Sequence, residues 1–173
     1  MKSSRIILTG FMGTGKTAVG RALAKKLSFT FFDTDLMVEE TTGKTVTAIF
    51  EKEGEAAFRI YEKQMVKKAL EADKIVVSTG GGAIVDSENR KLMKERGCIV
   101  GLSAPSEAIL QRIQNMDTRP LLNTQDRLKK IEALLSHRSP YYREADIIVD
   151  TSTRSVDETV EEILKFLHGN SAR

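Results

Sequence analysis

The chain has 173 residues, of which 40% are hydrophobic and 29% charged, and this composition suits a single domain spanning residues 1–173. The net charge is only +3, and with 6% aromatic residues and no Trp the chain offers little for binding nucleic acid. The sequence shows neither a signal-peptide core nor an apolar run of transmembrane length, and its one cysteine, Cys98, excludes an internal disulfide. We therefore expect a cytoplasmic protein with no membrane partner.

Short runs rich in β-branched and aromatic residues alternate with longer amphipathic runs along the chain. The short runs predict five strands, at residues 5–9, 30–32, 75–78, 98–102 and 147–150. The longer runs predict helices that begin near Lys16, Asp35, Thr45, Glu55, Ser87, Pro105 and Asp126, with a last helix after Ser155. Pro105 suits the first turn of its helix, Ser155 and Glu158 form a capping box, and residues 169–173 are expected to fray.

This order of elements predicts an α/β fold. Strands that are apolar on both faces and joined by helices form mostly parallel sheets, with helices covering both faces. We therefore expect a five-stranded parallel sheet with helices on both faces. Ligands bind such sheets at the carboxyl ends of the strands, so the motifs that follow the predicted strands are the candidates for a functional site.

A phosphate-binding loop follows the first predicted strand. Residues 10–17, Gly-Phe-Met-Gly-Thr-Gly-Lys-Thr, match the pattern G-x-x-x-x-G-K-[ST] and open a helix, as the mechanism requires. Backbone N–H groups in such a loop wrap an anion, Lys16 neutralises phosphate charge, and the Thr17 hydroxyl can ligate Mg²⁺. A glycine-rich turn without a ligand is the alternative, but the flanking strand and helix favour nucleotide binding. The residues predicted to bind ATP here are Gly13, Thr14, Gly15, Lys16, Thr17 and Ala18.

Two carboxylates, Asp33 and Asp35, follow the second predicted strand. Residues two apart in an extended segment point the same way, so both carboxylates can face one pocket. A solvated turn that caps the next helix is an equally good interpretation of this pair taken alone.

A second charged motif, E-x-x-F-R-x-x-E, covers residues 55–62. Arg59 and Glu62 lie three residues apart and share a helix face, so the carboxylate can hold the guanidinium. The forked guanidinium suits a substrate carboxylate, although an isolated pair of this kind is more often a surface ion pair.

Three successive glycines, Gly80, Gly81 and Gly82, follow the third predicted strand. Such a run loses more conformational entropy on folding than other sequences do, so it indicates a place where the backbone must approach a ligand closely. A merely flexible turn is the alternative interpretation.

Three arginines in the second half of the chain are further candidates. Arg119 precedes a proline in the segment 115–125, which biases this residue away from helix and predicts a mobile loop. Arg112 lies one helical stretch earlier, and Arg138 opens the pattern R-x-P-x-Y near a helix end. Taken singly, each could be a solvated arginine, or, for Arg138, a cation at the negative end of a helix dipole.

Together these motifs resemble the shikimate kinase family, over nearly the whole chain from Ile6 to about Leu167. The resemblance implies a P-loop NTPase fold of the nucleoside monophosphate kinase type with a lid at about 115–125. It implies Mg²⁺-dependent transfer of the γ-phosphoryl group of ATP to the 3-hydroxyl of shikimate, giving shikimate 3-phosphate for chorismate and aromatic amino acid biosynthesis. ATP and shikimate would then be the partners of a chain that we expect to be a monomer.

The resemblance also implies roles for individual residues. The expected catalytic residues are Lys16, Asp35 and Arg119. Arg119 would reach over the transferring phosphoryl group from the lid, and Arg112 would pack near the adenine of ATP. The expected metal-binding residues are Thr17 and Asp33. The expected shikimate-binding residues are Asp35, Arg59, Gly80, Gly81, Gly82 and Arg138.

Other functions share only part of this pattern. A kinase for another sugar acid such as gluconate, or a nucleoside monophosphate kinase, would share the phosphate loop but not the combination of D-x-D, E-x-x-F-R-x-x-E, three glycines and R-P-L-L. A nucleotide-dependent switch would be expected to carry an N-K-x-D guanine-reading motif, which the sequence does not show. A degenerate kinase would be expected to have lost some of the residues that this chain retains, namely Lys16, Thr17, Asp35 and Arg119.

Overall fold

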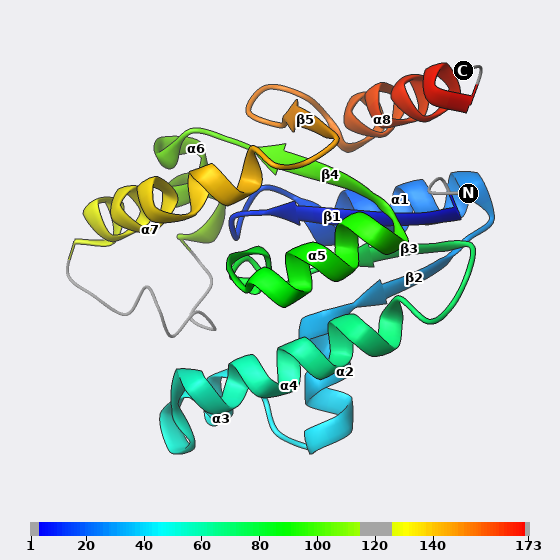
Figure 1. Ribbon diagram of the computed structural model, residues 1–173. Helices are drawn as coiled ribbons and strands as arrows, with labels where there is room; N and C mark the ends of the chain where they lie inside the picture. Colours follow the sequence, from blue (N-terminus) through cyan, green and yellow to red (C-terminus); the bar gives the residue numbers. More distant parts are fainter. Residues whose placement is uncertain (1–3, 115–125, 172–173) are drawn as a thin grey trace.

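A five-stranded parallel sheet forms the centre of the computed structural model, which describes residues 4–114 and 126–171 (Figure 1). The strands lie in the order β2-β3-β1-β4-β5. Their bounds are β1 Arg5–Gly10, β2 Thr30–Asp33, β3 Ile75–Ser78, β4 Cys98–Ser103 and β5 Ile147–Asp150. Every predicted strand is present to within one residue at each end, so the predicted sheet is confirmed. The expected lid at 115–125, with Arg119, lies outside the described residues.

Eight α-helices and one short 3-10 helix connect and flank these strands in the described part of the chain. They are α1 Lys16–Leu27, α2 Thr34–Thr42, α3 Val46–Lys52, α4 Gly54–Ala69, η2 Ala83–Val85, α5 Ser87–Arg96, α6 Ser106–Ile113, α7 Arg127–Tyr142 and α8 Val156–Ser171. The predicted helix starts are confirmed to within one residue, and the capping box of α8 is present, with reciprocal bonds between Ser155 and Glu158.

Two details differ from the prediction. Pro105 is the N-cap of α6 rather than a first-turn residue, because its extended backbone, with a ψ of 156°, lies outside the helix. Helix α8 continues to Ser171, so Gly169 is helical and not part of a frayed tail. Burial of Leu167 near the end of α8 anchors the last turns and explains why the helix extends this far.

Helices cover both faces of the sheet (Figure 1). Successive side chains of the central strand β1 point to opposite faces, and because they are apolar, both faces must be covered. Ile6 and Leu8 point into one core, with side chains from α1 and α8. Ile7 points into the other core, with side chains from α4 and α5. All three side chains are fully buried. The doubly covered parallel sheet brings the carboxyl ends of β1, β2 and β3 to one edge.

A smaller hydrophobic cluster joins α2, α3 and α4 beyond this edge of the sheet. Its buried members are Val38, Ile49, Phe58 and Met65. This packing fixes α2 and α4 relative to each other, so the charged side chains on both helices have defined positions. In residues 4–114 and 126–171, no helix has the length and apolar character needed to span a membrane.

Candidate active site

The phosphate loop connects β1 to α1, and its glycines are required by its backbone geometry. Gly10 has a φ of 140°, and a Cβ there would lie 2.3 Å from the Leu102 carbonyl oxygen of the neighbouring strand. Gly13 and Gly15 also have positive φ, at 80° and 93°. A side chain at any of these positions would distort the loop, so the glycine pattern reflects a tight turn at the N-terminus of α1.

Polar side chains close this turn on itself. Thr14 Oγ1 donates to the Phe11 carbonyl at 2.7 Å. Lys16 Nζ donates to the carbonyls of Gly10 and Phe11, each at 2.9 Å, which places the ammonium across the loop. The loop therefore carries a positive charge and a helix N-terminus at the same point, an arrangement that binds phosphate.

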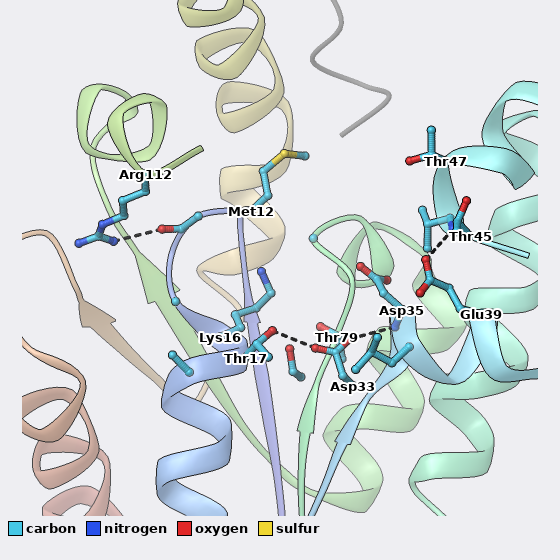
Figure 2. A pocket seen from close by; sticks show the side chains of 17 residues that line it. Met12, Lys16, Thr17, Asp33, Asp35, Glu39, Thr45, Thr47, Thr79 and Arg112 are labelled. Carbon is cyan, nitrogen blue, oxygen red and sulfur yellow. Dashed lines mark hydrogen bonds between the residues drawn. The ribbon is translucent and has the colours of Figure 1, made fainter. Parts of the chain in front are cut away.

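Thr17 and Asp33 bring two oxygens together beside the phosphate loop (Figure 2). Thr17 Oγ1 donates to Asp33 Oδ2 at 2.9 Å, and Asp33 Oδ1 accepts from the Asp35 N–H at 3.1 Å. Neighbouring ligands of an octahedral Mg²⁺ with bonds of about 2.0–2.1 Å are separated by about 2.9 Å, so this oxygen pair fits two positions of such a shell. Asp33 also caps α2, so the proposed helix-capping role and the metal-binding role are compatible.

A cavity of about 950 Å³ opens between the phosphate loop and helix α2 (Figure 2). Its lining includes many of the predicted site residues, namely Gly13, Gly15, Lys16, Thr17, Ala18, Asp33, Asp35, Gly81 and Arg112. Glu39, Thr45, Val46 and Thr47 also line it and had not been singled out from the sequence. Glu39 lies one turn after Asp35 on α2, and its Oε1 accepts from the Val46 N–H at 2.8 Å, which ties α2 to the start of α3.

The three glycines after β3 let charged side chains approach the backbone. A Cβ on Gly80 would lie 2.2 Å from Glu62 Oε1 and 2.8 Å from Asp35 Oδ1. A Cβ on Gly82 would lie 2.4 Å from Arg59 Nη2. None of the three glycines has a positive φ, so close packing, rather than unusual backbone geometry, is the reason for Gly80 and Gly82.

Arg59 is held by carboxylates on both sides. Its Nη1 donates to Glu62 Oε2 at 2.7 Å, and its Nη2 donates to Glu55 Oε1 at 2.7 Å. The Glu62 side chain is 1% exposed, so this is not the surface ion pair that was the alternative. Burial raises the pKa of Glu62 to about 7, although the charge of Arg59 acts in the opposite direction.

Arg138 lies on the other side of the glycine loop. It is 5% exposed, and its guanidinium lies 5.7 Å from the centre of the Phe11 ring. A Cβ on Gly81 would be in ordinary contact with Arg138 Nη1, at 3.6 Å. One turn later on α7, the Tyr142 hydroxyl donates to the Gly81 carbonyl at 2.6 Å, and burial raises the pKa of Tyr142 to about 12, so this donor stays protonated. The R-x-P-x-Y spacing could have indicated Tyr142 through its position on the same helix face.

Arg112 on α6 borders the phosphate loop from the opposite side. Its Nη1 donates to the Gly13 carbonyl and to Thr151 Oγ1, each at 3.1 Å, and its Nη2 donates to the Ser152 carbonyl at 3.3 Å. Figure 2 shows the bond between Arg112 and the loop. These hydrogen bonds fix the position of the Arg112 guanidinium beside the phosphate loop.

The fold and the loop define a P-loop kinase of the nucleoside monophosphate kinase type. A profile of the family "Shikimate kinase" matches residues 12–168. Shikimate kinase from Pelotomaculum thermopropionicum is 46% identical over 162 residues, covering 94% of each chain, and that from Geobacter metallireducens is 40% identical over 164 residues, covering 95% of this chain and 92% of its own. The structure of shikimate kinase from Acinetobacter baumannii in complex with shikimate matches with a TM-score of 0.96 at 39% identity, over 99% of this chain and 96% of that one.

The chain belongs to the shikimate kinase family. It is an ATP-dependent phosphotransferase of the shikimate pathway, which serves aromatic amino acid biosynthesis. A gluconokinase from Sinorhizobium meliloti matches with a TM-score of 0.58 at 18% identity, which is a likeness of fold alone. Membership of the shikimate kinase family sets aside the alternatives of a gluconate kinase, a nucleoside monophosphate kinase or a nucleotide-dependent switch.

Proposed function

We propose that the chain transfers the γ-phosphoryl group of ATP to the 3-hydroxyl of shikimate, with the residue roles given below. The observation that carries this proposal is the placement of two arginines, Arg59 and Arg138, against one glycine loop that also borders Asp35. Two guanidiniums beside one carboxylate suit an acceptor that bears both a carboxylate and hydroxyl groups.

On the nucleotide side, the loop residues Gly13, Thr14, Gly15 and Ala18 hold the phosphates of ATP mainly through the backbone. Lys16 compensates the charge that spreads over the phosphoryl oxygens in the transition state. Thr17 and Asp33 would hold Mg²⁺, which would supply positive charge to neutralise the phosphates. Arg112 borders the base, and Arg119 is proposed to reach the phosphoryl group on the strength of the family resemblance alone.

On the acceptor side, Asp35 orients the attacking hydroxyl. The hydroxyl oxygen forms a bond to the γ-phosphorus while the bond from that phosphorus to the bridging oxygen of ADP breaks, and the hydroxyl proton passes to Asp35 or to water. Arg59 and Arg138 bind the carboxylate, and the amides of Gly80, Gly81 and Gly82 line the same site. Fixing the carboxylate leaves one hydroxyl within reach of the phosphorus, which is catalysis by positioning.

Three further statements about the chain remain proposals. We propose that residues 1–173 act as one domain, that the segment 115–125 serves as a lid, and that the chain works as a monomer. We place it in the cytoplasm because its proposed co-substrate, ATP, is abundant there. Size-exclusion chromatography with light scattering at assay concentration tests the monomer directly.

The experiment that tests the proposed function is ADP release by the purified protein with and without Mg²⁺. Shikimate is compared with quinate, gluconate, nucleoside monophosphates and no acceptor. We expect Mg²⁺-dependent release that only shikimate stimulates, and a product whose phosphorus couples to the proton on carbon 3 in NMR spectra. Stimulation by another acceptor, or a phosphate on another hydroxyl, would contradict the proposed acceptor geometry.

A further inference from the structure

Thr151, the first residue after β5, lies where three elements meet behind the phosphate loop. The residue is buried, with 4% exposed. Its N–H donates to the Ser103 carbonyl at 2.8 Å, which continues the pairing of β5 with β4. Its hydroxyl lies 3.0 Å from the Thr14 carbonyl and 3.1 Å from the Ser103 carbonyl, and it accepts from Arg112 Nη1 at 3.1 Å. One side chain thus joins the sheet, the phosphate loop and α6.

The bond to the Thr14 carbonyl determines the direction of the N–H of the next residue, Gly15. In a planar trans peptide the C=O and the following N–H point in opposite directions. A Thr14 carbonyl that faces Thr151 therefore turns the Gly15 N–H away from Thr151. Gly15 lines the cavity beside Lys16, so this N–H is directed toward the side on which phosphate is proposed to bind.

Several contacts flank this peptide: Thr14 is buried and its hydroxyl donates to the Phe11 carbonyl, and the Gly15 carbonyl accepts from the Val19 N–H. Gly15 itself adds little packing. The nearest atom to a Cβ built on Gly15 is Val19 Cγ2 at 3.9 Å, and Gly15 has no side chain of its own. A glycine at a φ of 93° has several accessible conformations, and the bond from Thr151 acts directly on the carbonyl of this peptide. The preceding carbonyl, of Gly13, is fixed by Arg112, which itself bonds to Thr151.

We propose that Thr151 is a positioning residue for ATP. Its hydroxyl holds the Thr14 peptide so that the Gly15 N–H faces the phosphates. It also supplies one of the bonds that hold Arg112, beside those to the carbonyls of Gly13, Thr151 and Ser152. Thr151 does not line the cavity formed by the described residues, so it acts through Thr14 and Arg112 and not by touching the nucleotide. The proposal rests on the roles given above to the phosphate loop.

The test compares Thr151→Val, which keeps the shape and removes the hydroxyl, with Thr151→Ser, which keeps the hydroxyl. We expect Thr151→Val to raise KM for ATP, and the Kd of a non-hydrolysable ATP analogue measured by calorimetry, by roughly tenfold. KM for shikimate should stay within about twofold, and Thr151→Ser should restore most of the affinity for ATP. Thr159→Val is the matched control, because Thr159 is 1% exposed and its hydroxyl also donates to a backbone carbonyl, that of Ser155 in the same β5–α8 region.

Three results would overturn the proposal: unchanged analogue affinity in Thr151→Val, an equal loss for both substrates, or the same loss in Thr159→Val. If Thr151→Val fails to fold, Thr151→Ala removes the same hydroxyl without placing a methyl group against the carbonyls, and the same comparison applies. Wild-type protein that binds the analogue but releases no ADP with shikimate would contradict the proposed reaction and leave the Thr151 comparison intact.

Discussion

Arg59 is proposed to serve the acceptor site through its geometry as well as its charge. Two carboxylates hold its guanidinium, and Gly82 leaves room for it against the backbone. We expect Arg59→Lys to raise KM for shikimate roughly tenfold to a hundredfold, with kcat and KM for ATP changed much less, because an ammonium cannot form the paired bonds of a guanidinium. Steady-state kinetics with each substrate varied in turn provides the measurement.

Arg5→Lys is the matched control for this prediction. Arg5 pairs with Asp73 at 2.9 Å and donates to the Ala72 carbonyl, at the opposite end of β1 from the phosphate loop. The substitution Arg5→Lys should leave KM for shikimate and KM for ATP unchanged. An Arg59→Lys effect confined to ATP would show that Arg59 does not bind the acceptor.

Glu62 makes the stability of the protein depend on pH. Its pKa is about 7 in the folded protein because of burial, against an ordinary value of 4.5, so the folded state holds a proton that the unfolded state releases. This contribution to stability is fully present below about pH 4.5 and is lost as the pH rises through 7. Relative to wild type, Glu62→Gln should therefore gain about 2 to 3 kcal/mol in the free energy of unfolding between pH 5 and pH 8.

Urea unfolding of both proteins across this pH range measures the difference. Glu55→Gln removes the half-exposed carboxylate partner of Arg59 and is the appropriate comparison. If the stability of both variants relative to wild type changed with pH in the same way, weakened ion pairing of Arg59 would be the cause. If the difference in unfolding free energy between Glu62→Gln and wild type stayed constant with pH, Glu62 would not titrate in this range.

At the scale of elements, the glycine loop depends on having no side chain at Gly80. A methyl group there would meet Glu62 Oε1, which belongs to the partner of Arg59, and Asp35 Oδ1, which belongs to the residue proposed to orient the acceptor hydroxyl. We expect Gly80→Ala to destabilise the fold by about 1 to 3 kcal/mol through overpacking and to raise KM for shikimate more than KM for ATP. Gly169→Ala is the contrasting change, since open space surrounds that helical glycine, and it should stabilise by about 0.5 to 1 kcal/mol. Full activity and stability in Gly80→Ala would refute this account of the loop.

Most helices and strands could be predicted because residues close together in the sequence determine them. The strands follow from short apolar runs, and α8 follows from a capping box that the structure reproduces. The 3-10 helix η2 was missed because tertiary packing shapes it: Ala83 and Ile84 are buried in the core that also holds Val66 of α4. Thr151 was missed for the same reason, since its partner Thr14 lies 137 residues away in the sequence. The motif residues and the local pair of Arg59 with Glu62 could be named from spacing, but the contacts between distant parts of the chain could not.

At the scale of the whole molecule, the proposed acceptor site joins parts of the chain that are far apart in sequence. Asp35 comes from α2, Arg59 from α4, the glycines from the loop after β3 and Arg138 from α7. Unfolding disperses these groups, so shikimate binds only the native state and must stabilise it. At about 100 times its Kd, shikimate should raise the free energy of unfolding by about 2.7 kcal/mol.

The methyl ester of shikimate at the same concentration separates recognition of the carboxylate from general effects of a polyol. It retains the ring and hydroxyls but lacks the charge that Arg59 and Arg138 are proposed to bind, so we expect it to stabilise the protein far less. Urea unfolding monitored by circular dichroism, with sodium chloride added to match ionic strength, measures both ligands. Equal stabilisation by acid and ester would mean that binding depends on the hydroxyl groups, and the placement of Arg59 and Arg138 would then need another explanation. Strong stabilisation by the acid alone would show that the carboxylate is bound by groups that only the native fold brings together.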